Sequence, residues 1–182
     1  MALEFTTSYI KDSLALFRHY KKLAEAAMAQ ATDEQLFVTL DPEANSIAIV
    51  VKHMAGNMRS RWTDFLTSDG EKPDRNRDTE FEDAPPTREA LLAIWEQGWG
   101  CVFRALEPLS DADLERSVAI RAEAHSVMQA INRQIAHYAY HAGQIVLLAK
   151  HFQHAQWRSL SVPRGKSADF NRRVTSGDAS QR

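Results

Sequence analysis

The feature that most constrains the fold is a set of long segments with helical periodicity, separated by few glycines and prolines. Only seven glycines and six prolines occur among the 182 residues, and most of them lie between these segments. Within each segment apolar residues recur every three or four positions, which is the spacing of one face of an α-helix. The pattern predicts an all-α protein.

Four of these segments are long enough to be the principal helices of a bundle. A Ser or Asn N-cap is expected at Asn45 or Ser46, and the pattern TDEQ after the first segment predicts a capping box that opens a short helical turn. Four helices of this length predict a four-helix bundle. The segments span about 7–31, 46–68, 87–106 and 125–152.

The connections between the helices carry further information about topology. The polar, proline-bounded stretch SDGEKPDRNRDTEFEDAPP between the second and third helices is long for a compact domain, so it can carry the chain back and make these helices parallel. This predicts an up-down-down-up order. LFVTLD at 36–41 and SVAIRAE at 117–123 alternate apolar and polar residues, and they are candidates to pair as a short two-stranded β ribbon.

Length and composition limit the class of protein. A chain of 182 residues fits one domain, which we expect over residues 1–170, followed by a flexible, polar C-terminal tail at 171–182. The formal net charge of -2 argues against nucleic acid or an anionic membrane as a partner. The apolar runs are too short to span a membrane and the N-terminus lacks a signal-peptide pattern, so we expect a cytoplasmic protein.

Two histidines four residues apart are the strongest candidates for chemistry. His137 and His141 lie about 40° apart around a helix axis and about 6 Å along it, so both point the same way. His53, in the middle of the second helix with apolar neighbours, is the best candidate for a third metal ligand, and three histidines with an open position are typical of a catalytic metal site. Spacing alone also allows hydrogen-bonded core or rim histidines.

A family resemblance favours the metal site. The stretches VVKHMAGNMRSRWTDFL, AINRQIAHYAYHAGQIVLLAK and WRSLSVPRGKSADFN resemble the DinB/YfiT-like superfamily of metalloproteins, and the similarity covers about residues 4–171. The resemblance implies an up-down-down-up four-helix bundle and a metal triad that falls on His53, His137 and His141. It also implies a divalent transition metal such as nickel or zinc, and imidazole ligands suit both.

Polar residues one helical turn from these histidines are candidates to support them. By spacing these are Asn57 and Arg61 on the second helix, and Gln134 and Gln144 on the fourth. Their alternative role is that of solvated or helix-capping side chains. Arg61 would also be able to clamp a carboxylate if the substrate were anionic.

Two functional hypotheses follow. In the first, the protein is a metal-dependent enzyme whose three-histidine site activates water or a low-molecular-weight thiol for hydrolysis or transfer of a small-molecule substrate; some members of the superfamily are thiol-dependent. In the second, it is a non-enzymatic, dimeric helical bundle with a role in a stress response, in which metal or histidines are structural. A homodimer is expected, and Trp95 and Trp99 on the third helix are candidates for its hydrophobic interface.

Overall fold

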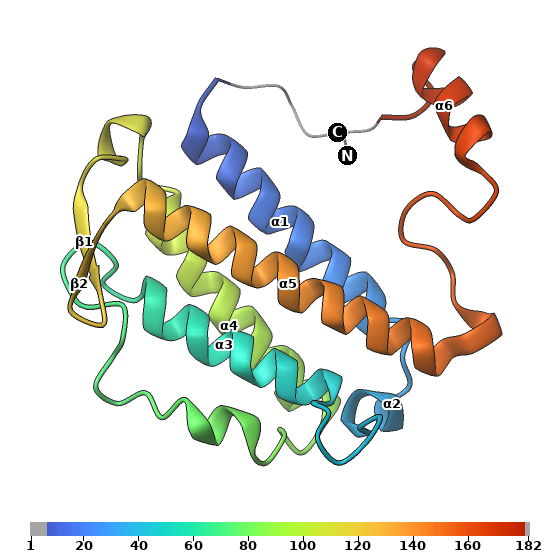
Figure 1. The fold of residues 1–182 in the computed structure, drawn as a ribbon, viewed down its shortest axis with the longest axis horizontal. Helices are drawn as coiled ribbons and strands as arrows, with labels where there is room; N and C mark the ends of the chain where they lie inside the picture. The colour runs from blue at the N-terminus through green and yellow to red at the C-terminus, as the bar shows by residue number, and fades with distance from the viewer. Residues whose placement is uncertain (1–6, 181–182) are drawn as a thin grey trace.

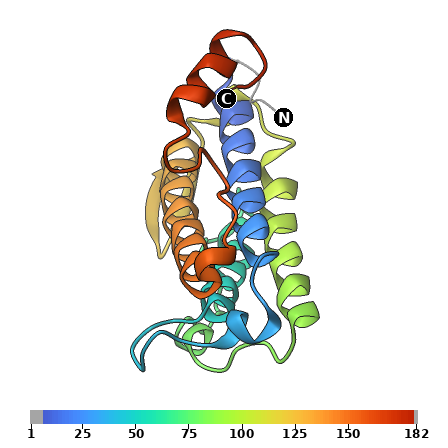
Figure 2. The ribbon, with the colours of Figure 1, turned by 90° about the vertical axis from the view of Figure 1, so that its right-hand side faces the viewer.

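Four long helices form the body of the molecule in the computed structural model, which describes residues 7–180. They lie side by side in Figures 1 and 2, with a small antiparallel β hairpin at one end. In Figure 1, α1 and α5 run from left to right, whereas α3 and α4 run from right to left. The four helices are α1 (Tyr9–Met28), α3 (Ile47–Trp62), α4 (Arg88–Leu106) and α5 (Val127–Gln153).

Shorter elements connect and extend these helices. They are α2 (Asp33–Phe37), η1 (Asp78–Phe81), η2 (Asp111–Asp113), β1 (Ser117–Ile120), β2 (Glu123–Ser126), η3 (His154–Gln156) and α6 (Ser167–Thr175), where η marks a 3₁₀ helix. The described part of the protein is therefore mostly helical, with one two-stranded sheet.

The helices begin where the sequence supplies an N-cap. Ser46 accepts a hydrogen bond from the backbone N–H of Ile49, which settles the choice between Asn45 and Ser46. Thr32 and Gln35 form the capping box expected from TDEQ. Each side-chain cap satisfies a backbone N–H that a helix terminus leaves without an intrahelical partner. The same type of cap is present at Ser8, Thr87 and Ser126.

Helix α3 ends earlier than the periodicity predicts. The prediction extends to about Ser68, but the chain leaves the helix after Trp62, where Thr63 is extended and Asp64 has a positive φ of 48°. A positive φ in a residue other than glycine is incompatible with continuing a right-handed helix. The connection to α4 is consequently longer than expected, and it contributes to the site described below.

The core is dense in aromatic side chains. Phe17 of α1 packs edge-on against Trp62 and Trp99, with ring centroids 5.9 and 6.2 Å apart. Trp95 and Trp99 are completely buried within the chain. The prediction that these tryptophans form a dimer interface is therefore wrong. Their side chains on α4 face the other helices of the same chain, and their burial there stabilises the monomer.

The predicted β ribbon exists, but its partner is different. The strand at 117–120 pairs with β2, with Val118 opposite His125, and not with residues 36–41. Arg121 and Ala122 have φ of 56° and 62°, which fits the two-residue turns that favour local hairpins. His125 consequently lies in β2, and Ser126, rather than His125, opens α5.

The C-terminal part leaves the bundle after α5. Figures 1 and 2 show α6 set apart from the long helices, and this helix spans the boundary at residue 170 between the expected domain and tail. The flexibility of the tail stays a prediction. Within residues 7–180, no helix combines the length and apolar character needed to cross a membrane.

Candidate metal centre

Three histidines converge between α3 and α5. The Nε2 atom of His137 lies 3.3 Å from Nε2 of His53 and 3.0 Å from Nε2 of His141. One possible ligand atom from each ring lies within 4.8 Å of the others. The two histidines of α5 share a helix face, as their spacing predicts, and the contact between α3 and α5 brings His53 to them.

The outer nitrogens of two rings are held by hydrogen-bond acceptors. Nδ1 of His53 lies 2.8 Å from Oε2 of Glu80, and Nδ1 of His141 lies 2.7 Å from Oε1 of Gln144. A neutral imidazole that donates its Nδ1–H to such an acceptor keeps a lone pair on Nε2. Lone pairs that face one another across about 3 Å fit a shared cation, and the carboxylate behind His53 repeats a common arrangement around metal-binding histidines.

Burial keeps His137 and His141 of α5 neutral, and its effect on His137 is large. Burial, followed by the proximity of His141 and His53, lowers the pKa of His137 to about 3. Its Nδ1 atom is buried without a hydrogen-bond partner among the described residues. Burial also lowers the pKa of His141, although the hydrogen bond to Gln144 opposes the shift. The imidazoles of His137 and His141 are thus neutral at physiological pH, as metal ligation requires.

Glu80 is the residue that sequence reasoning missed. It lies in η1, within the long connection between α3 and α4, and only 6% of it is exposed. Burial raises the pKa of Glu80, but hydrogen bonds from His53 and Arg75 outweigh this, so the pKa is lowered and the carboxylate stays charged. The connection has no helical periodicity, so the sequence carried no signal that Glu80 would reach His53.

Arg75 links Glu80 to a wider ion-pair network. Its guanidinium donates to both carboxylate oxygens of Glu80, at 2.8 and 3.0 Å. It also lies 3.3 Å from Glu71, which in turn accepts from Arg61 at 2.9 Å and from Arg121 at 3.0 Å. A bidentate arginine fixes the orientation of a carboxylate. The network therefore holds Glu80, and through it the ring of His53.

The four residues selected by spacing lie in different surroundings. Gln144 contacts His141 directly, whereas Asn57 accepts a hydrogen bond from Tyr138 at 3.1 Å. Arg61 donates to the carbonyl of Gly70 and to Glu71 instead of contacting a histidine. Gln134 is buried beside His137, and its Oε1 has no partner among the described residues.

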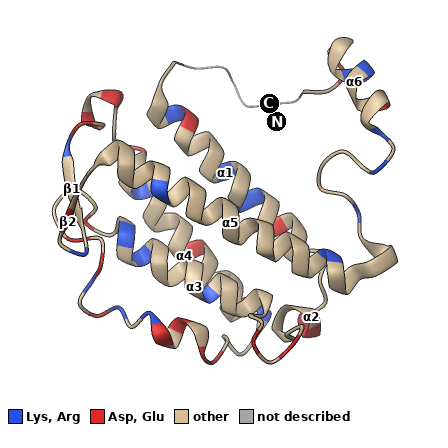
Figure 3. Cartoon of the chain, viewed as in Figure 1, with Lys and Arg blue, Asp and Glu red and all other residues tan. Residues whose placement is uncertain are grey.

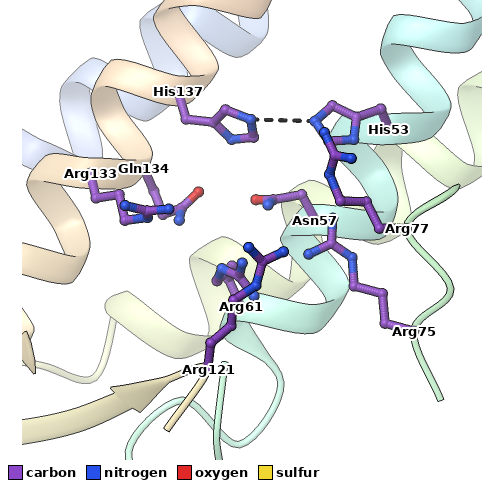
Figure 4. Close-up of a pocket in the computed structure, with 9 residues that line it drawn as sticks. All are labelled: His53, Asn57, Arg61, Arg75, Arg77, Arg121, Arg133, Gln134 and His137. Atoms are coloured by element: carbon purple, nitrogen blue, oxygen red, sulfur yellow. Dashed lines mark hydrogen bonds between the residues drawn. The ribbon is translucent and has the colours of Figure 1, made fainter. Parts of the chain in front are cut away.

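A cavity of about 430 Å³ opens beside the histidines. Five arginines line it, from α3, α5, the β hairpin and the long connection, and Figure 4 shows them around the open space below His53 and His137. Figure 3 shows Lys and Arg segments gathered near the hairpin, at the adjoining ends of α3 and α5. The lining residues are His53, Asn57, Arg61, Arg75, Arg77, Arg121, Arg133, Gln134 and His137.

A helical bundle with three inward-facing histidines defines a class of protein whose fold and donor set are compatible with a metal site. The family model described as a protein of unknown function, DUF1572, matches residues 4–166. The chain belongs to this family, which is DinB-like.

The comparison with solved structures supports the same fold. The crystal structure of a DinB-like protein from Bacillus cereus ATCC 10987 is similar, with a TM-score of 0.56 and 16% identity, over 81% of this chain and 95% of that chain. Similarity at this level of identity shows the fold alone. No curated protein matches the sequence.

Proposed function

We propose that this protein is a divalent-metal-dependent enzyme in which His53, His137 and His141 hold the ion. The observation that supports this most directly is the convergence of three Nε2 atoms, two of them on rings whose Nδ1 atoms are held by Glu80 and Gln144. A bound divalent ion would lower the pKa of a water or a thiol at an open coordination position. The reaction proposed is hydrolysis or group transfer on a small molecule.

The residues of the chain have separate tasks in this proposal. Glu80 and Gln144 set the tautomers and orientations of His53 and His141, so that both present Nε2 to the same point. Burial keeps His137 and His141 neutral. The arginine-lined cavity gives a substrate access to the histidines from one side. The up-down-down-up order is part of the same proposal, supported by the helix directions in Figure 1.

Nickel or zinc is the proposed metal, because imidazole nitrogen suits both ions. Activation of a low-molecular-weight thiol, rather than water, is carried over from the resemblance to the superfamily. A cytoplasmic location and a homodimer stay predictions, and the dimer no longer has the tryptophan interface that sequence reasoning offered for it. The alternative of a purely structural, stress-related bundle differs from the proposal in needing no accessible coordination position.

Metal analysis of the protein purified without an affinity tag tests the proposal. We expect close to one divalent ion per chain after incubation with zinc or nickel and removal of free ion, and almost none in the variant with His53→Ala, His137→Ala and His141→Ala. A variant with His19→Ala and His151→Ala, two exposed histidines elsewhere on the molecule, is the matched control and should bind like the wild type.

Circular dichroism must show that the triple variant is folded, and the single change His137→Gln serves if it is not. Equal metal binding by the wild type and the histidine variants would overturn the proposal. A stoichiometric ion with every coordination position filled by protein, seen by X-ray absorption spectroscopy, would favour the structural alternative.

A further inference from the structure

The cavity beside the histidines has more positive charge than the carboxylates paired with its arginines neutralise. Five arginines line it, and within residues 7–180 the carboxylates paired with them are Glu71 and Glu80. Five positive charges less two negative ones leave three. The excess is local, because the whole chain has a formal net charge of -2. A concave site lined by one sign of charge concentrates ligands of the opposite sign.

Two of the five arginines are free to receive a ligand. Arg61, Arg75 and Arg121 each donate to Glu71, and Arg75 donates also to Glu80. In the described part of the chain, Arg77 and Arg133 have no ion pair. Figure 4 shows them entering the cavity from opposite sides, Arg133 from α5 and Arg77 from the long connection.

Arg77 is also held close to the histidines. Its guanidinium lies over the ring of Phe81, 4.9 Å from the centroid. The same ring lies 4.6 Å from the ring of His53. A cation over an aromatic face is favourable and restricts the arginine without using its hydrogen-bond donors. The donors of Arg77 are thus placed at the mouth of the histidine cluster.

Buried polar atoms in the cavity wall also lack partners. Oε1 of Gln134, on a residue only 2% exposed, and Nε of Arg61, on a residue 5% exposed, make no hydrogen bond within the described chain. A buried polar atom without a partner costs about 1–3 kcal/mol, so such atoms are normally satisfied by solvent or by a ligand. One is an acceptor and the other a donor, which fits a ligand with hydroxyl or amine groups as well as an anionic group.

We propose that this cavity binds a small anionic substrate, whose phosphate or carboxylate group lies between Arg77 and Arg133 and whose remaining part faces the histidines. The inference rests on the proposed function, since it names the substrate class of the same site. A volume of about 430 Å³ suits a small molecule. Arg61, the clamp suggested by sequence, is instead committed to Gly70 and Glu71.

Titration calorimetry at low ionic strength tests this, with inorganic phosphate and succinate as separate probes on metal-free protein. We expect one site per chain, and a Kd at least about tenfold weaker in the variant with Arg77→Gln and Arg133→Gln, because charge-assisted hydrogen bonds are lost. Arg158→Gln, at an exposed arginine beyond the far end of α5, is the matched control and should bind like the wild type. Added salt should weaken binding to the wild type.

Each outcome decides the proposal. Tighter binding of phosphate supports a phosphorylated substrate, and tighter binding of succinate supports a carboxylate. No binding of either probe to the wild type, or equal binding by the double variant, would overturn the anion site. Binding that requires added metal and ignores both arginines would overturn it too. Metal content, measured on the same variants, reports on the proposed function independently, because neither arginine contacts a histidine nitrogen.

Discussion

Nδ1 of His53 donates to Oε2 of Glu80 across 2.8 Å, although 27 residues separate the two in sequence. The contact joins a helix of the bundle to the connection that leads to the next helix. Nε and Nη2 of Arg75 in turn donate to the two carboxylate oxygens of Glu80. The connection between α3 and α4 is therefore part of the candidate metal centre, and its length has a structural reason.

Glu80→Gln tests this relationship. The amide can still accept from His53, but it loses the negative charge and the paired interaction with Arg75, so we expect zinc affinity to fall by roughly 10- to 100-fold. Glu82→Gln, an exposed neighbour in the same connection, is the control and should bind zinc like the wild type. Competition with a chelator of known affinity measures both. An unchanged affinity in Glu80→Gln would show that the carboxylate does not support the ligand.

Gly56→Ala should weaken zinc binding through Glu80. A Cβ at Gly56 would lie 2.8 Å from Cδ of Glu80 and closer still to Oε1, so the buried carboxylate must shift from the position in which it contacts His53. Gly143→Ala is the matched control, because a Cβ there has nothing within 4 Å. It should leave zinc affinity unchanged and stabilise α5 by up to about 1 kcal/mol, the usual helix preference of Ala over Gly. Equal zinc affinities in the two variants would contradict this account.

A feature of this fold or site can be predicted from the sequence when the residues that cause it are close together in the chain. The helix caps at Thr32 and Ser46 and the shared face of His137 and His141 follow from spacing within one helix, and the structure has them. Glu80 depends on a connection that long-range contacts hold in place. Lys52, for example, donates to the carbonyl of Asp83 at 2.8 Å. No periodicity in the sequence encodes such a contact.

The β hairpin shows a second limit. Alternation at 36–41 and at 117–123 looked equivalent, and nothing in the pattern chose a partner. The strand at 117–120 pairs with the segment that follows its turn, and a long-range contact supports this turn. Asp69, in the connection between α3 and α4, accepts the backbone N–H groups of Arg121 and Ala122, at 2.8 and 2.7 Å, where both residues have positive φ. Neither residue is a typical turn residue, so the hairpin had no sequence signal.

Tyr138→Phe should destabilise the fold while leaving zinc binding nearly unchanged. The buried hydroxyl accepts from Nε1 of Trp62 at 2.9 Å and donates to Oδ1 of Asn57 at 3.1 Å. Removing it leaves both partners unsatisfied, which costs about 1–3 kcal/mol. Tyr140→Phe, at an exposed tyrosine on the same helix, is the control and should change the free energy of unfolding by less than about 0.5 kcal/mol. Urea denaturation with a parallel zinc titration measures both, and equal stabilities of the two variants would be inconsistent with the buried network.

The metal-free protein should lose stability as the pH falls below about 6.5. Burial lowers the pKa of His137 to about 3 and lowers that of His141, whereas both titrate near 6.5 when unfolded. Between these values the unfolded chain binds more protons than the native one, so stability decreases on acidification, by up to about 1.4 kcal/mol per pH unit for each histidine. Urea denaturation between pH 5 and 6.5 measures the slope above the range in which ordinary carboxylates titrate. His137→Gln should reduce this slope by an amount that corresponds to nearly one proton, whereas His151→Gln, at an exposed histidine, should leave it unchanged. Equal slopes for the wild type and His137→Gln would mean that His137 is not buried in its neutral form.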